Sequence, residues 1–199
     1  MPAVRFPALL LGVGTSLFTY FLTAKLFKSE RIALGAVLLN HIVPMFVAGS
    51  ILMTIDPPFF FCWAAATFFA AIAIFRERSW AWAIVGAFVG IGFLAKYAMF
   101  LWFVGLLGFL VLDPHCRRQL KSAGPWLALV IALAFTTPVI LWNARHGWVS
   151  LQHVAHQTGA SGGSLRQGNF FEFLASQIGL LGPLPVSYTH LTLPTICSV

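Results

Sequence analysis

Several side chains with possible chemical roles lie between or inside long apolar runs of this sequence. Asp56 precedes one such run, and a carboxylate there could position an acceptor group or remove its proton. Lys96 interrupts the run 80–112, where an amine could bind an anion. Arg145 and His146 follow the run 125–142. The first question is therefore which elements place these groups, and whether they place them together.

Asp56 and Lys96 each have a structural explanation as well as a chemical one. Asp56 could cap the helix that follows it, with Pro57 at the first helical position. Such a cap would not exclude a functional role. Lys96 could extend its charge to the membrane surface from a helix end, or it could face a wet cavity or an anion. Both interpretations of each residue stay open from the sequence alone.

Other polar or small residues inside the apolar runs are expected to serve helix packing. Asn40 and His41 precede Pro44, and we expect them to form hydrogen bonds between helices around a proline kink. Three glycines of one apolar run are Gly86, Gly90 and Gly92. No strand precedes these glycines, so we expect close helix packing there and no nucleotide-binding loop.

Three histidines follow the last long apolar run: His146, His153 and His156. The latter two share one face if residues 148–157 form a helix. No Glu or Cys nearby completes a zinc site, so we expect neither a metal nor a cofactor. An amphipathic helix at the membrane interface is the favoured alternative.

The composition excludes a soluble enzyme or free-standing binding module. Hydrophobic residues make up 59% of the 199 residues and charged residues only 9%, against about 25% charged in an ordinary soluble domain. Mean hydropathy is +0.88. The net charge of +7 does not indicate nucleic acid, because the cations form no patch with interleaved aromatic residues. The sequence therefore predicts a membrane protein.

Continuous apolar runs favour helices over a β-barrel and predict an all-α, polytopic transmembrane bundle. It would have six spans and the start of a seventh near residues 170–184. The expected spans are 6–27, 32–54, 57–75, two from 80–112 divided at Lys96, and 125–142. Each half of the divided run reaches only about 24 Å, which is short of a ~30 Å hydrocarbon core. Lys96 would then lie in a dip below the outer surface.

The cations set the expected orientation, because loops rich in Lys and Arg stay in the cytoplasm. Eight cations occupy the odd-numbered loops: Lys25, Lys28, Arg31, Arg76, Arg78, Arg117, Arg118 and Lys121. Four fall on the opposite side, namely Arg5, Lys96, Arg145 and Arg166. We therefore expect Asp56, Lys96 and the segment after residue 142 to share the external face.

Three stretches of the chain resemble glycosyltransferase family 39, in the dolichyl-phosphate-mannose protein mannosyltransferase superfamily, which includes bacterial aminoarabinose lipid A transferases. They are Asp56-Pro57 at the start of a span, the glycine-containing run from Gly86 to Lys96-Tyr97, and Pro138-Val-Ile-Leu-Trp-Asn143 continuing to Ser150. The last stretch is the most specific, and the resemblance covers roughly residues 4–184.

The resemblance implies a GT-C membrane fold in a bacterial plasma (inner) membrane. It implies transfer of a sugar from a polyprenyl-phosphate donor to a lipid, glycan or protein acceptor on the periplasmic or external side. Lys96 matches a family lysine near the lipid-linked phosphate, and Asp56 matches a family acidic residue near the pocket. Asn143, Arg145 and His146 match the start of a long external loop. Tyr97, beside Lys96, joins these as an expected substrate-binding residue.

The sequence also departs from the family pattern at both ends. The family's principal catalytic carboxylate lies in a first external loop, and we expect this chain to lack that loop. We therefore expect a fragment that is inactive alone, with Asp56 in a supporting role. Residues 1–185 would be a partial transmembrane glycosyltransferase module. Residues 186–199 resemble translated sequencing-adaptor read-through, with an ordinary disordered terminus as the alternative.

The main rival interpretation is a transporter or flippase subunit, with Lys96 as a coupling or substrate-binding charge. Such proteins often contain internal repeats and broken helices near the membrane midplane. The sequence has no convincing repeat, and its few polar groups are expected on one face. A non-catalytic membrane scaffold would not explain the grouping of Asp56, Lys96 and Arg145. Sugar transfer is therefore the preferred prediction.

Overall fold

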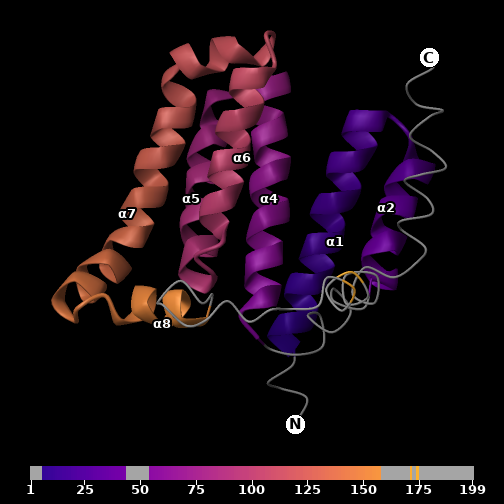
Figure 1. The fold of residues 1–199 in the computed structure, drawn as a ribbon. Coiled ribbons are helices and arrows are strands. Elements are labelled where there is room, and N and C mark those ends of the chain that lie inside the picture. Colours follow the sequence, from indigo (N-terminus) through magenta and orange to yellow (C-terminus); the bar gives the residue numbers. More distant parts are fainter. Residues whose placement is uncertain (1–5, 44–53, 158–170, 172–173, 175–199) are drawn as a thin grey trace. The chain divides into compact units, whose positions relative to one another are not determined.

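Residues 6–43, 54–157, 171 and 174 are described by a computed structural model, and they contain helices and no strand (Figure 1). The helices are α1 (Phe6–Phe27), α2 (Glu30–Ile42), α4 (Asp56–Phe75), α5 (Ser79–Ala95), α6 (Met99–Leu112), the 3-10 helix η1 (Cys116–Lys121), α7 (Ala123–Arg145) and α8 (Val149–Gln157). The expected all-α bundle of apolar helices is confirmed.

The chain divides into two compact units. The first comprises Met1–His41 with Phe46–Thr137, and the second comprises Ile42–Met45 with Pro138–Val199. In the first unit α4 packs against α1 and α5, and α5 packs against α6. Figure 1 shows α4 and α5 running side by side in opposite directions. Trp82, Met99 and Leu110 are fully buried in the core that α4, α5 and α6 form with one another.

Among the described residues, three helices are long and apolar enough to cross a membrane: α1, α4 and α7. Helices α5 and α6 are shorter, with 17 and 14 residues, which correspond to about 26 and 21 Å. Lys96 has an extended backbone conformation immediately after α5. The predicted division of the long apolar run at this residue is therefore confirmed. The predicted span 32–54 can be followed as helix only to Ile42.

The glycines of α5 lie where neighbouring helices approach most closely. A Cβ added to Gly86 would overlap the backbone of Ala128 in α7, and one added to Gly90 would overlap Phe135. At Gly92 an added Cβ would lie 2.9 Å from the Cβ of Cys62 in α4. Close packing, as predicted for these glycines, is therefore confirmed.

Helices α1 and α2 are joined by contacts between polar side chains. Asn40 Nδ2 donates a hydrogen bond to Thr19 Oγ1 at 3.4 Å, and His41 Nε2 lies 3.4 Å from Ser16 Oγ. The predicted interhelical role of Asn40 and His41 is confirmed. The proline expected to kink this helix, Pro44, lies outside the described residues.

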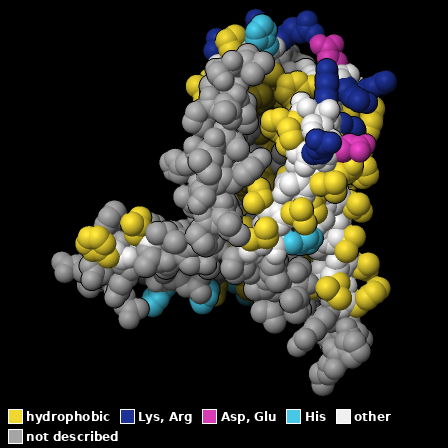
Figure 2. All heavy atoms as spheres, turned by 90° about the vertical axis from the view of Figure 1, so that its right-hand side faces the viewer, with side chains coloured by type: hydrophobic (Ala, Val, Ile, Leu, Met, Phe, Trp, Pro, Cys, Tyr) yellow, Lys and Arg dark blue, Asp and Glu magenta, His cyan; other side chains and the backbone are white. Residues whose placement is uncertain are grey.

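Lys and Arg side chains gather at one end of the first unit, above a flank of hydrophobic side chains (Figure 2). Exposed apolar residues such as Leu10, Val13 and Leu38 cover the helices below. In a bilayer these residues would face lipid, where no water competes for them. Most of the expected seventh span and the segment 186–199 lie outside the described residues.

Gly86→Ala tests the close approach of α5 and α7. The added methyl group meets backbone, which cannot rotate away, so we expect a loss of about 1–3 kcal/mol in unfolding free energy. The control is Gly108→Ala in α6, where an added Cβ meets nothing within 4 Å; it should be neutral or slightly stabilising. Equal stability of the two variants in detergent denaturation would contradict the packing described.

Cys116 in η1 provides a second test. The thiol is buried, and burial, together with the negative charge of Asp113, raises its pKa above the ordinary value. Because the thiolate is the reactive form, we expect slow alkylation of Cys116 at pH 8 and faster alkylation as pH rises or the chain is unfolded in detergent. Peptide mapping after maleimide treatment measures the rate, and equal rates in folded and unfolded protein would refute the burial.

Candidate functional site

The antiparallel α4–α5 hairpin brings two residues forty positions apart into contact. Asp56 is the first residue of α4, and Lys96 follows the last residue of α5. The start of one antiparallel helix and the end of the next lie at the same end of the pair. The Lys96 Nζ donates to Asp56 Oδ1 at 2.9 Å. The structure thus joins the carboxylate and the amine that the sequence singled out.

Asp56 is held by its neighbours and does not cap α4. The capping position is occupied by Ile55, and Asp56 already lies within the helix. Its Oδ2 accepts a hydrogen bond from the Thr54 hydroxyl at 3.4 Å, and its backbone N–H donates to Thr54 Oγ1 at 3.3 Å. The N-cap interpretation of Asp56 is therefore wrong, because the carboxylate is bound by an ammonium group instead.

The positive end of the α4 helix dipole further favours a carboxylate at Asp56. The side chains of Lys96 and Asp56 remain 37% and 31% exposed. The pair is therefore neither fully solvated nor sealed inside the protein, and it remains accessible to a ligand. An exposed ion pair contributes only about 0.2–1 kcal/mol to stability. The stability of the fold therefore does not explain why this ion pair lies here.

The Lys96 side chain lies where three helices converge. Its backbone N–H donates to Gly92 O at 2.9 Å, and its own carbonyl accepts from Met99 N at 3.0 Å as α6 begins. The Nζ also lies 5.5 Å from the centroid of the Phe59 ring, a distance at which a cation is attracted to an aromatic face. These contacts fix the base of the side chain and orient its charged end.

Two apolar hollows lie along α4, and one of them begins near this pair, at Phe59. One, of about 410 Å³, is lined by Phe59, Phe60, Trp63 and polar groups of α1 and α2 that include Thr19. The second, of about 420 Å³, is lined almost entirely by apolar side chains. The two hollows share Leu22, Trp63 and Thr67. Phe59 therefore contacts the Lys96 ammonium and also lines the hollow beside it.

Tyr97 is partly exposed, and its ring packs 5.1 Å from that of Phe93. Sequence reasoning missed Thr54 and Phe59. Phe59 could have been found from its spacing: it lies three residues after Asp56, and residues three apart lie on one face of a helix. Thr54 gave no comparable signal, since a threonine two residues before a carboxylate occurs in many turns.

Asn143, in the second unit, organises the turn between α7 and α8. Its Nδ2 donates to Val139 O at 3.0 Å, and its Oδ1 accepts from Ser150 N at 3.2 Å. Its backbone carbonyl accepts from Trp148 N at 2.8 Å. Asn143 is buried. Its described contacts thus give it a structural role within this turn.

Arg145 and His146 lie at the end of α7 and are exposed. The His146 ring stacks on Trp142 with centroids 4.3 Å apart, and its Nδ1 lies 2.8 Å from the Trp142 carbonyl. Within the described part of the chain, no ion pair includes Arg145. The grouping of Arg145 with Asp56 and Lys96 stays a prediction.

His153 and His156 fall in α8, so the helix expected for residues 148–157 is confirmed for Val149–Gln157. The described residues contain no group of three or more His, Cys, Asp or Glu placed to hold a metal ion.

Comparisons with known proteins identify the family of this chain. Residues 1–142 match the family model described as dolichyl-phosphate-mannose-protein mannosyltransferase. The chain is also 33% identical over 127 residues to lipid A galacturonosyltransferase RgtD of Rhizobium johnstonii. That alignment covers 59% of this chain and 26% of the relative, so the chain spans about a quarter of the relative's length. No solved structure matches. The chain belongs to the dolichyl-phosphate-mannose-protein mannosyltransferase family.

Proposed function

We propose that the protein is a membrane glycosyltransferase that moves a sugar from a polyprenyl-phosphate donor to an acceptor at the external or periplasmic face of a bacterial inner membrane. The observation that carries the proposal is the contact between Lys96 and Asp56 at one end of an apolar hairpin. The family match supports the reaction class. The excess of cations at the opposite end of the helices supports the orientation.

The Lys96 ammonium provides the proposed phosphate contact. An ammonium group has three N–H donors, and in the described structure a single hydrogen bond uses one of them, to Asp56. The other donors can bind phosphate oxygens. The neighbouring apolar hollows can hold part of the polyprenyl chain, because they begin beside Phe59 and continue along α4. Donor phosphate and donor lipid would then occupy adjoining polar and apolar surfaces.

In the proposed reaction an acceptor oxygen attacks the anomeric carbon of the donor sugar. The bond between that carbon and the phosphate oxygen breaks, and its electron pair leaves with polyprenyl phosphate. Lys96 stabilises this growing negative charge, and a preorganised cation does so best where water is scarce. The acceptor proton passes to a carboxylate. Asp56 holds Lys96 in place and supports this proton transfer.

We propose that four further residues contribute to the substrate-binding surface: Tyr97, Asn143, Arg145 and His146. Tyr97 adjoins Lys96 in the chain, and Arg145 supplies a second cation near the end of α7. Asn143 would act by fixing the turn that presents its neighbours. The name of the relative directs the choice of substrates for a first test: a galacturonic acid donor and a lipid A acceptor. Other sugars and other lipid, glycan or protein acceptors complete the panel.

Lys96→Gln in the full-length protein tests the phosphate contact. The change removes the charge and keeps a side chain of similar length, so transfer from a polyprenyl-phosphate sugar should fall about a hundredfold or more. Lys28→Gln is the matched control, because Lys28 is an exposed lysine in the loop between α1 and α2. Its transfer rate should match the unmodified protein in the same vesicles.

Normal transfer by the Lys96→Gln protein would remove Lys96 from the mechanism. Movement of the intact lipid-linked sugar across vesicles, with no new glycosidic bond, would support the transporter interpretation instead.

Asp56→Asn tests whether Asp56 positions Lys96 for the reaction or only stabilises the fold. The amide oxygen can still accept a hydrogen bond, but the attraction between opposite charges is lost. We expect the donor KM to rise about tenfold while the unfolding free energy changes by no more than about 1 kcal/mol. An unchanged KM and kcat, measured across a donor titration, would show that Asp56 neither positions Lys96 nor assists proton transfer.

A further inference from the structure

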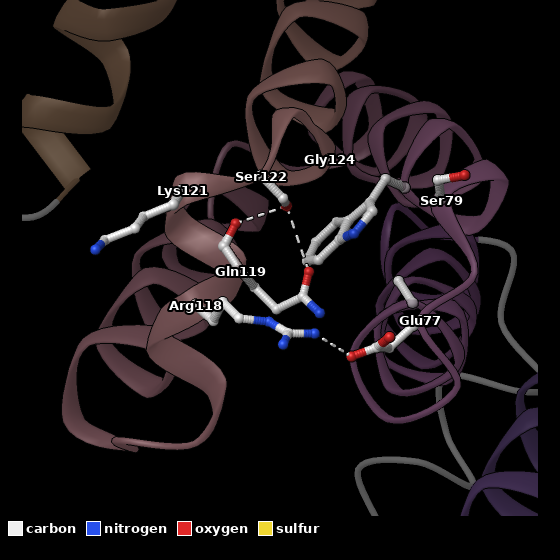
Figure 3. A pocket seen from close by; sticks show the side chains of 9 residues that line it. Glu77, Ser79, Arg118, Gln119, Lys121, Ser122 and Gly124 are labelled. Carbon is white, nitrogen blue, oxygen red and sulfur yellow. Dashed lines mark hydrogen bonds and ion pairs between the residues drawn. The ribbon is translucent and has the colours of Figure 1, made fainter.

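A second polar site lies at the end of the first unit opposite to Asp56 and Lys96. It is a hollow of about 370 Å³ between the α4–α5 loop and η1. Its polar lining includes Glu77, Arg118, Gln119 and Lys121 (Figure 3). None of these residues takes part in the proposed transfer reaction, so the hollow requires its own explanation.

An exposed ion pair connects the loops around the hollow. The Arg118 Nη2 donates to Glu77 Oε1 at 2.6 Å. Figure 3 shows the Arg118 guanidinium and the Gln119 amide near this contact, while Lys121 extends away from it. A guanidinium group has five N–H donors, and the ion pair with Glu77 uses one of them. Arg118 therefore keeps donors for a second anion.

Trp82 is the most informative residue of the lining. It is only 2% exposed, yet its indole N–H makes no hydrogen bond to any described residue. The described residues contain no fully enclosed side-chain nitrogen or oxygen that lacks a partner. The Trp82 N–H must therefore open to the hollow that the residue lines. A buried donor in that position is suited to an acceptor from outside the protein.

The position of the hollow along the helices, relative to the expected bilayer, indicates a lipid ligand. Helix α4 has 20 residues and rises about 30 Å from Asp56 to the hollow, which matches the thickness of a bilayer's hydrocarbon core. Trp80 directly follows the lining residue Ser79, and Trp126 lies two residues after the lining residue Gly124. Both tryptophans are about half exposed. Exposed tryptophans are enriched at the membrane–water interface. The hollow therefore lies at headgroup level.

We propose that this hollow binds the phosphodiester headgroup of an anionic phospholipid. The phosphate accepts from Arg118, Gln119 and the Trp82 N–H, and a headgroup hydroxyl donates to Glu77. Lys121 and the surrounding cations of the same loops, Arg76, Arg78 and Arg117, give the site a positive field. A phospholipid there would tie η1 to the α4–α5 loop at the membrane surface.

Native mass spectrometry of the full-length protein, titrated with phosphatidylglycerol, phosphatidylethanolamine or inorganic phosphate, tests the proposal. We expect phosphatidylglycerol to bind at least about tenfold more tightly than phosphatidylethanolamine, because the two lipids share the phosphodiester but the ammonium group of phosphatidylethanolamine is repelled by the cations around the hollow. Millimolar inorganic phosphate should not displace it. Equal binding of the two lipids, or displacement by inorganic phosphate, would overturn the assignment to an anionic lipid.

Two variants locate the lipid. Arg118→Gln should weaken phosphatidylglycerol binding about tenfold, because it removes a charged donor. Arg78→Gln is the matched control: it removes one cation from the same end, but Arg78 does not line the hollow. It should change binding less than about twofold, because its charge acts only through screened solvent. Equal losses in both variants would refute a defined site and indicate a diffuse charge effect.

Trp82→Phe provides a test that does not depend on charge. It keeps an aromatic ring in the core and removes the N–H. We expect phosphatidylglycerol affinity to fall about fivefold, as for the loss of one hydrogen bond, with transfer activity retained. Unchanged affinity in a folded Trp82→Phe protein would contradict the proposed contact. This result is independent of the Lys96 experiments, so the lipid site and the transfer site can fail separately.

Discussion

The proposed transfer site depends on one ion pair between the ends of two antiparallel helices. Lys96 and Asp56 are 2.9 Å apart, and each is placed by a break in an apolar run: Lys96 by the gap between α5 and α6, and Asp56 by the start of α4. A charge is costly inside a bilayer. Placing both charges at one end of the hairpin lowers that cost and leaves a cation able to bind a phosphate near the membrane surface.

Two polar sites lie at opposite ends of this hairpin, separated by about the thickness of a bilayer's hydrocarbon core. At one end Lys96 is paired with a carboxylate beside apolar hollows, as a lipid-linked sugar phosphate requires. At the other end Arg118 and Trp82 line a polar hollow among cations, as a structural phospholipid requires. In our proposals each site binds a phosphate group through a cation that is paired with a carboxylate. The two sites differ in their surroundings, because only the first ion pair has an apolar hollow beside it in the described residues.

The sequence predicted the features that follow from local patterns. Apolar run lengths predicted the helices, and the lysine inside a 33-residue run predicted the break between α5 and α6. The glycine spacing predicted close packing at Gly86. The sequence could not decide whether Asp56 caps its helix or binds Lys96, because that depends on how α4 and α5 align. It also missed the hollow at Arg118 and Trp82, since those residues meet only after α6 and η1 return to α4. The contribution of Arg145 stays a prediction.

The most direct test exchanges the two charges. A protein with Asp56→Lys and Lys96→Asp keeps an ion pair between the same helices but moves the cation from the α5–α6 break to the start of α4. We predict that it folds with nearly the stability of the unmodified protein, and that its affinity for polyprenyl phosphate falls at least about tenfold, because the cation no longer points to the donor phosphate. Undiminished polyprenyl phosphate binding by the exchanged protein would contradict the account and reduce the pair to a structural contact.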